Sequence, residues 1–254
     1  MSALAPWFDV LVIGWTIIAA IAFVALRFLR AAYGRYTAQS RAPLIPAAVG
    51  WVAMELVATL LFALFFFTSE RVTHTPSLVL FALFELHYIH RSLIYPLRAR
   101  IRGRKMPISI LALGTLFNLV NASLLGTWLF HLGPARDASW LLDPRFVIGA
   151  LVFFFGMVVN IDSDNRLRAL RRDNGADYKI PRGGLFRWVS CPNYLGEIVE
   201  WCGFALCTWS MAGLSFAAWT FANLAPRAFS HHRWYRETFE DYPEERKALF
   251  PYIV

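Results

Sequence analysis

Residues 160–201 read NIDSDNRLRALRRDNGADYKIPRGGLFRWVSCPNYLGEIVEW, a polar, cationic stretch that continues at both ends into hydrophobic helical segments. The chain around it is 57% hydrophobic and 17% charged, with 10 Trp and 22 Phe among its 254 residues. A composition this apolar is typical of a chain whose helices lie in lipid. The sequence therefore predicts an all-α polytopic membrane protein that keeps this polar stretch for a specific purpose.

Apolar runs on either side of the stretch have the lengths of membrane spans, which need roughly 20 mostly apolar residues. These runs cover residues 8–29, 46–67, 77–94, 107–130 and 146–161, and the last is short enough to continue into the polar stretch. A further run, 198–224, has one charged residue, Glu200, and small or polar residues at Ser210, Gly213 and Ser215. This run forms either one long span or two spans joined by a turn.

The distribution of Lys and Arg decides between six and seven spans, because these residues collect on the cytoplasmic side of a membrane. They gather in alternate connections and in the C-terminal tail: Arg27, Arg30, Arg35 and Arg41; Arg91, Arg98, Arg100, Arg102, Arg104 and Lys105; seven Lys or Arg after the fifth run; and Arg227, Arg233, Arg236, Arg246 and Lys247. The other connections hold only Arg71, and Arg136 with Arg145. This alternation predicts seven transmembrane helices, with the N-terminus outside, the C-terminus cytoplasmic and a turn near residues 210–213.

The net charge of +8 follows from the cytoplasmic loops and indicates contact with anionic headgroups or an anionic soluble ligand. We expect no nucleic-acid partner, because the chain has no nucleic-acid motif. It also has neither a GxGxxG fingerprint nor a P-loop lysine. His87 and His90 form an HxxH pair, but no third ligand accompanies them, so we expect no metal site.

Three segments place polar side chains on one face of a helix, because residues three or four apart are neighbours there. The rows are Asn160, Asp164, Arg168 and Arg171; Asn193, Glu197 and Trp201; and Arg227, His231 and Tyr235. Such rows suit a polar, anionic ligand. The alternative is that they are solvated helix ends and positive-inside anchors.

Glu55 lies near the middle of the second run, where an acidic side chain costs on the order of 2.5 to 3.5 kcal/mol. It should therefore face a cavity or a partner. On the third run, Tyr88, Arg91 and Tyr95 share a face, and a phenol near a carboxylate in a dry pocket is a strong donor to a ligand carbonyl. The alternative is that Glu55 and Tyr88 only hold helices together. Glu85 and Glu200 we interpret as structural.

Three C-terminal stretches, GMVVNIDSDNRLRALR, YKIPRGGLFRWVSCPNYLGEIVEW and RAFSHHRWYRETFEDYPEERKALFPYIV, resemble the steroid 5-alpha-reductases. In the N-terminal half, YGRYT, Glu55 and HYIHRSLIYP fit that family in order and spacing. The resemblance implies a seven-helix membrane 3-oxo-5-alpha-steroid 4-dehydrogenase, here a bacterial homologue. Such an enzyme takes a hydride from NADPH and saturates the 4,5 double bond of a 3-oxo-4-ene steroid.

The same resemblance assigns roles within a single domain of residues 1–254. Residues 1–130 would mainly form the substrate pocket, where Glu55 and Tyr88 match the catalytic pair that binds the 3-oxo group. Met54 departs from the family, which has Gln at this position. Residues 146–254 would mainly bind NADPH. The expected cofactor-binding residues are Tyr33, Arg91, Tyr95, Asn160, Asp164, Arg168, Arg171, Tyr178, Asn193, Glu197, Arg227, His231 and Tyr235.

Two other functions are compatible with parts of the sequence. CPNYLGEIVEW loosely resembles the signature of S-adenosylmethionine-dependent membrane methyltransferases of the isoprenylcysteine carboxyl type. A non-catalytic sterol-binding or lipid-binding protein would keep an apolar cavity but has no use for the polar row that begins at Asn160. We expect a monomer in contact with membrane lipids and a lipophilic, steroid-like substrate. It would lie in the inner membrane of a bacterium or the endoplasmic reticulum of a eukaryote, with a cytoplasmic cofactor site.

Overall fold

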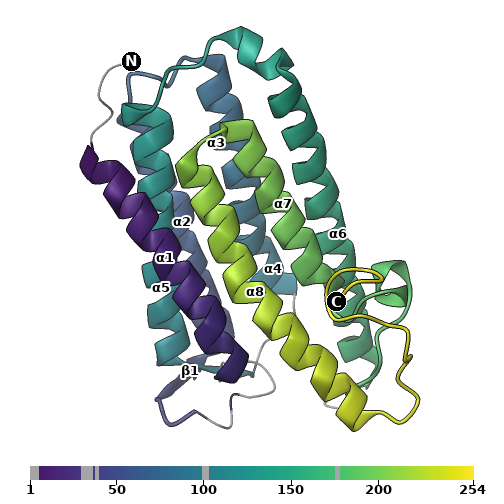
Figure 1. Cartoon of the computed structure of the whole chain (residues 1–254). Helices are drawn as coiled ribbons and strands as arrows, with labels where there is room; N and C mark the ends of the chain where they lie inside the picture. The colour runs from purple at the N-terminus through teal and green to yellow at the C-terminus, as the bar shows by residue number, and fades with distance from the viewer. Residues whose placement is uncertain (1–5, 30–36, 38–39, 99–102, 175–177) are drawn as a thin grey trace.

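The computed structural model of the chain describes residues 6–29, 37, 40–98, 103–174 and 178–254, and gives only the backbone of residues 171–174. Within these residues, seven helical rods run side by side (Figure 1). The helices are α1 (Pro6–Phe28), α2 (Ala47–Phe67), α3 (Thr75–Ile89), α4 (Tyr95–Arg98), α5 (Ile108–Gly126), α6 (Pro144–Asn174), α7 (Pro192–Thr208) and α8 (Met211–Thr238). The predicted all-α class is confirmed.

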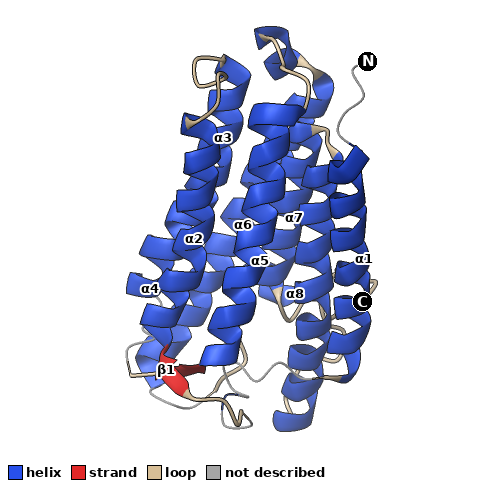
Figure 2. Ribbon diagram, turned by 90° about the vertical axis from the view of Figure 1, so that its left-hand side faces the viewer, coloured by secondary structure: helices blue, strands red, loops and turns tan. Residues whose placement is uncertain are grey.

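Short elements extend or connect the rods. A π-helical turn, His90–Ile94, joins α3 to α4 as one rod, and a second, Thr127–Leu132, extends α5. Single 3-10 turns lie at Ala138–Leu142 and Gly184–Arg187. Strands β1 (Leu44–Pro46) and β2 (Lys105–Pro107) pair antiparallel at one end of the bundle (Figure 2), where they tie the start of α2 to the start of α5.

Five of the described helical rods are long and apolar enough to cross a membrane by length and composition. They are Pro6–Phe28, Ala47–Phe67, Thr75–Arg98, Ile108–Leu132 and Pro144–Leu170. They coincide with the five apolar runs of the sequence, and α6 continues into the polar stretch as its short apolar run suggested. The chain is thus a polytopic helical membrane protein.

The apolar run at residues 198–224 is divided between α7 and α8. Helix α7 ends at Thr208, Trp209 adopts a left-handed backbone with φ 43°, and the Ser210 side chain accepts a hydrogen bond from the Gly213 N–H at 3.0 Å. A serine at this position is a favourable N-cap for the helix that follows. The predicted break at residues 210–213 is therefore confirmed, whereas the membrane orientation that it supports stays a prediction.

Helices α6 and α7 pack backbone against backbone because glycine occupies the contact positions on both. A Cβ on Gly156 would lie 2.3 Å from the backbone N of Glu200, and one on Gly203 would lie 2.3 Å from that of Phe153. Small residues at such positions let membrane helices approach closely. This close approach brings the polar rows of α6 and α7 face to face.

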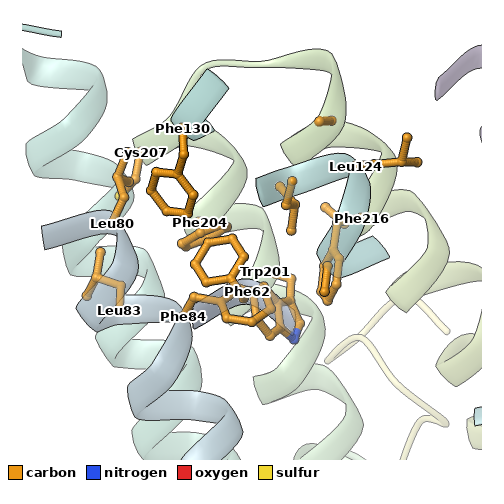
Figure 3. Close-up of a cluster of buried hydrophobic side chains, with 14 of the residues drawn as sticks. Phe62, Leu80, Leu83, Phe84, Leu124, Phe130, Trp201, Phe204, Cys207 and Phe216 are labelled. Atoms are coloured by element: carbon orange, nitrogen blue, oxygen red, sulfur yellow. The ribbon is translucent and has the colours of Figure 1, made fainter. Parts of the chain in front are cut away.

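The interior of the bundle away from the strand pair is filled with aromatic rings (Figure 3). Phe62, Phe84, Phe130 and Phe204 are each at most 2% exposed. Phe62 stacks on Phe84 with ring centroids 3.8 Å apart and meets Phe130 at 5.0 Å. A buried aromatic side chain makes many dispersion contacts, so this cluster contributes strongly to the packing of the described bundle.

The C-terminal tail holds the loop that leads into α7. Ser190 Oγ lies 2.6 Å from Tyr242 Oη and 2.7 Å from His232 Nδ1, and it donates to the Lys247 carbonyl at 3.0 Å. Val189 and Lys247 form a parallel bridge, and burial raises the pKa of the Tyr242 hydroxyl. These contacts fix the start of α7, which carries part of the polar group described next.

Candidate functional site

Glu55 and Tyr88 lie on different helices and are joined through Asn118 on a third. Tyr88 Oη donates to Asn118 Oδ1 at 3.1 Å. The Asn118 amide nitrogen donates to the Met54 carbonyl at 2.7 Å and to Glu55 Oε2 at 3.3 Å. Tyr88 and Asn118 are each 3% exposed, and Glu55 is half-buried. The phenol and the carboxyl group therefore belong to one network, in which an amide lies between them.

Arg91 crosses from the α3 rod to α6 and α7. Its guanidinium nitrogens lie 3.5 Å from Asp164 Oδ2 and 3.4 Å from Glu197 Oε2, and all three side chains are largely buried. The guanidinium also covers the rings of Trp51 and Tyr95, with centroids at 5.1 and 4.8 Å. A buried cation held by two carboxylates and two aromatic faces has a fixed position. Arg91 thereby gathers predicted residues from three rods.

The polar rows of α6 and α7 interlock beside Arg91. The Asn160 amide nitrogen donates to the Asn193 carbonyl at 2.9 Å and to Glu197 Oε2 at 3.4 Å. The Asn193 amide nitrogen in turn donates to Asp164 Oδ1 at 3.2 Å. The helical periodicity used to predict these rows thus brings four of their side chains into mutual contact: Asn160, Asp164, Asn193 and Glu197.

An open pocket adjoins this polar group at the surface. It is lined by His90, Tyr95, Arg98, Ile161, Asp164, Asn165, Leu167 and Arg168. Tyr95 and Asp164 belong both to the pocket wall and to the Arg91 group, so the pocket leads to the buried polar side chains. Arg98 and Arg168 place two guanidinium groups in its lining, which suits an anionic ligand.

The α8 row is divided between two places. His231 Nε2 lies 3.3 Å from Tyr194 Oη on α7. Tyr194 also interacts electrostatically with Arg227 and Asp164. Tyr235, at the far end of the row, stacks on Tyr242 with centroids 5.4 Å apart. Arg227 and His231 therefore lie near the polar group, whereas Tyr235 packs with the C-terminal tail.

Three other predicted cofactor residues are not placed beside Arg91. Tyr178 is 41% exposed and meets the Trp234 ring edge-on at 5.2 Å, within the aromatic group at the end of α8. Tyr33 lies outside the described residues, and Arg171 lies on α6 where only the backbone is described. Their predicted roles stay predictions.

The sequence did not reveal the roles of Asn118 and of the pair formed by His87 and Glu200. His87 Nδ1 lies 2.8 Å from Glu200 Oε1 with both side chains buried, and the His87 ring meets the Tyr88 ring edge-on at 5.1 Å. Glu200, interpreted as structural, is thus bonded to the residue next to Tyr88. Asn118 lies inside an apolar run, and a single asparagine there forms no helical row or motif that would mark it as functional.

The donor set of the site fits a phosphorylated, polar cofactor better than a metal ion. Arg98 and Arg168 line the pocket, and among the described residues the buried Nε of Arg227 has no hydrogen-bond partner. Guanidinium groups of this kind bind phosphate oxygens. In the described part of the chain, no group of three or more His, Cys, Asp or Glu is arranged to hold a metal ion.

Several known proteins that are similar to this chain belong to one family. The family model described as 3-oxo-5-alpha-steroid 4-dehydrogenase matches residues 104–254. The Bos taurus protein 3-oxo-5-alpha-steroid 4-dehydrogenase 1 is 41% identical over 238 residues, which cover 92% of each chain. The Homo sapiens protein of the same name is 42% identical, with 91% of this chain and 89% of that one covered. The Arabidopsis thaliana steroid 5-alpha-reductase DET2 is 42% identical, with 91% and 90% covered.

Proposed function

The chain belongs to the 3-oxo-5-alpha-steroid 4-dehydrogenase family, and we propose that it acts as a steroid 5-alpha-reductase that uses NADPH. The reaction reduces the 4,5 double bond of 3-oxo-4-ene steroids to give 5-alpha-3-oxo steroids. The observation that carries the proposal is the network of Tyr88, Asn118 and Glu55, which lies between a dry aromatic interior and a polar group open to a cationic pocket. Family membership leaves the methyltransferase and lipid-binding alternatives without support.

The site residues act on the carbonyl end of the substrate. Tyr88 Oη donates a hydrogen bond to the 3-oxo oxygen and stabilises the negative charge that develops there as the double bond is reduced. Such a donor is most effective where water is excluded, and Tyr88 packs against Phe84 at 4.5 Å and Trp201 at 5.8 Å. Glu55 supports this network through Asn118, and the carbon alpha to the carbonyl is protonated afterwards.

NADPH, when bound, supplies the hydride that adds to the carbon beta to the carbonyl. The residues that would hold it line the pocket and the polar group behind it. Arg98 and Arg168 line the pocket, where they suit phosphate oxygens, and Asn193 and Glu197 offer hydrogen bonds in the polar group behind it. Arg91 stays between Asp164 and Glu197 and keeps the two helices in place.

We also keep the membrane topology as a proposal: seven spans, an outside N-terminus and a cytoplasmic C-terminus. Its support is the alternation of basic loops. A reporter fused after Val254 should be cytoplasmic, and one inserted near Gly213 should be exported. The opposite result at either site would rule this orientation out. A monomeric state and an inner-membrane location, if the source is a bacterium, are proposed with it.

The function is tested with the full chain purified in detergent and supplied with NADPH and a panel of 3-oxo-4-ene steroids. The nicotinamide absorbance should fall only when a steroid is present, and mass spectrometry should find a product two hydrogens heavier. A panel that includes enone lipids without a steroid ring shows how narrow the substrate range is. Consumption of S-adenosylmethionine, or binding of steroid without any reduction, would contradict the proposal.

A further inference from the structure

Asn118 contacts both proposed catalytic groups from a third helix. It is on α5, whereas Glu55 is on α2 and Tyr88 is on α3. Gly114, one helical turn earlier on α5, packs closely against the Met54 side chain of α2, because a Cβ there would lie 2.6 Å from the Met54 sulfur. Asn118 therefore lies where α2 and α5 are close enough for a short amide side chain to bridge them.

The chemistry of its partners fixes the orientation of the Asn118 amide. The Met54 carbonyl oxygen, 2.7 Å away, can only accept a hydrogen bond, so the NH₂ group must face it. The same NH₂ group faces Glu55 Oε2, and the amide oxygen is left facing Tyr88 Oη. An amide oxygen has no hydrogen to give. Tyr88 is thus the donor, and its single hydroxyl hydrogen points at Asn118.

A phenol has one hydrogen, and the proposed reaction requires that hydrogen to point at the substrate carbonyl. We infer that Asn118 is a positioning residue for the reduction: it holds the Tyr88 hydroxyl and the Glu55 carboxyl group together until the steroid carbonyl replaces its amide oxygen as the acceptor. The inference rests on the proposed function. The Asn118 NH₂ group keeps its hydrogen bonds to Met54 and Glu55 during the exchange. The network therefore stays ordered while the steroid carbonyl replaces the amide oxygen as the acceptor.

Asn121 provides a matched comparison on the same helix. It is 2% exposed, close to the 3% of Asn118, and its side chain also makes two kinds of hydrogen bond. Its oxygen accepts from Trp15 Nε1 at 3.2 Å, and its nitrogen donates to the Phe117 carbonyl at 2.9 Å. In the part of the chain that the structure describes, these bonds reach neither Glu55 nor Tyr88. Asn121 thus represents a buried asparagine with a structural role.

The test compares Asn118→Leu and Asn121→Leu with the parent chain in detergent. We expect Asn118→Leu to lower kcat about tenfold, less than the 10²- to 10³-fold loss of a direct oxyanion donor, because Tyr88 remains. The steroid KM should stay the same or fall, because the Tyr88 hydroxyl no longer has to break a hydrogen bond to Asn118 before it binds the steroid. The NADPH Kd, measured by nicotinamide fluorescence, should not change. Asn121→Leu should lower the unfolding temperature about as much as Asn118→Leu does, but it should leave kcat close to that of the parent.

A double-mutant cycle separates positioning from general damage. Tyr88→Phe with Asn118→Leu should be no slower than Tyr88→Phe alone, because the amide acts through the phenol. If Asn118→Leu does not fold, Asn118→Ser removes the same contacts without added bulk and is measured in its place. A parent-like kcat in the Asn118 variants, an equal loss in Asn121→Leu, or additive losses in the double variant would overturn the inference. A parent chain that binds NADPH but reduces no steroid would contradict the proposed function instead.

Discussion

The two halves of the α3 rod have opposite surroundings. In its first half, Leu80, Leu83 and Phe84 are buried among the aromatic rings of the bundle interior (Figure 3). One turn later, His87, Tyr88 and Arg91 are each engaged by polar partners from α5, α6 or α7. The same helix thus passes from a dry aromatic cluster to a polar network, and the proposed carbonyl site lies at the boundary.

This difference shows how one bundle separates stability from chemistry. Aromatic packing is favourable without any precise partner, whereas each buried polar group must be matched or it destabilises the fold. The polar half therefore needs several helices to satisfy its groups, as Arg91 does with Asp164 and Glu197. We expect substitutions in the aromatic cluster to lower stability and those in the polar network to lower activity.

Phe130→Ala should give the largest effect and should act on stability. Phe130 is 2% exposed and packs against Phe62 and Phe66, with centroids 5.0 and 5.2 Å away. Removing a buried Phe costs about 3 to 5 kcal/mol, which a lowered unfolding temperature in detergent would report. Phe67→Ala, at a ring that is 69% exposed on the bundle surface, is the control and should change little. Unchanged stability in Phe130→Ala would contradict the view that the aromatic cluster stabilises the bundle.

Tyr88→Phe should keep the fold and the cofactor but lose most turnover. The substitution removes one donor to the developing oxyanion, which typically costs about 2.7 to 4 kcal/mol of transition-state stabilisation. Steady-state kinetics with a saturating steroid would measure the loss in kcat. Tyr252→Phe, at a tyrosine that is 82% exposed, should behave like the parent. Near-parent turnover in Tyr88→Phe would remove Tyr88 from the catalytic role.

Arg168→Ala should raise the KM for NADPH about tenfold or more, because a charge-assisted contact to phosphate contributes about 1.5 to 3 kcal/mol. The sequence leads us to expect the same of Arg171→Ala. Arg145→Ala is the control at the opposite end of α6, where that guanidinium is bonded to Asp143 at 2.8 Å. A KM for NADPH that is unchanged in both variants would place the cofactor elsewhere.

Glu55→Gln should have the smallest effect of the series. In the parent chain Glu55 accepts a hydrogen bond from Asn118 at 3.3 Å, and the amide oxygen of the new glutamine can still accept it. Only the negative charge beside the network is lost. We expect a weakening of steroid binding by about 1 kcal/mol, near the mean value of one hydrogen bond. A steroid titration at saturating NADPH would measure it. If binding and turnover match those of the parent, Glu55 has only a structural role.

The sequence by itself determined the class of the protein and much of its local order. Five of the apolar runs predicted helices that are long and apolar enough to cross a membrane, whereas the count of seven spans stays a prediction. A serine followed by small residues predicted the break between α7 and α8. Helical periodicity placed Asn160 and Asp164 on one face, because an α-helix has about 3.6 residues per turn and residues four apart therefore lie on the same side. The C-terminal stretches predicted the steroid 5-alpha-reductase family, which the relatives confirm.

The contacts between helices were decided by the tertiary structure alone. Periodicity says which residues share a face but not what that face meets, so it did not foresee Asn118 between Tyr88 and Glu55 or Glu200 beside His87. The glycines that bring α6 onto α7 set the depth at which their polar rows meet. Tyr235 packs with Tyr242, a contact that periodicity did not foresee, and its predicted place beside the cofactor stays a prediction. The rotation of each helix about its own axis is set by packing against its neighbours, and no single helix encodes it.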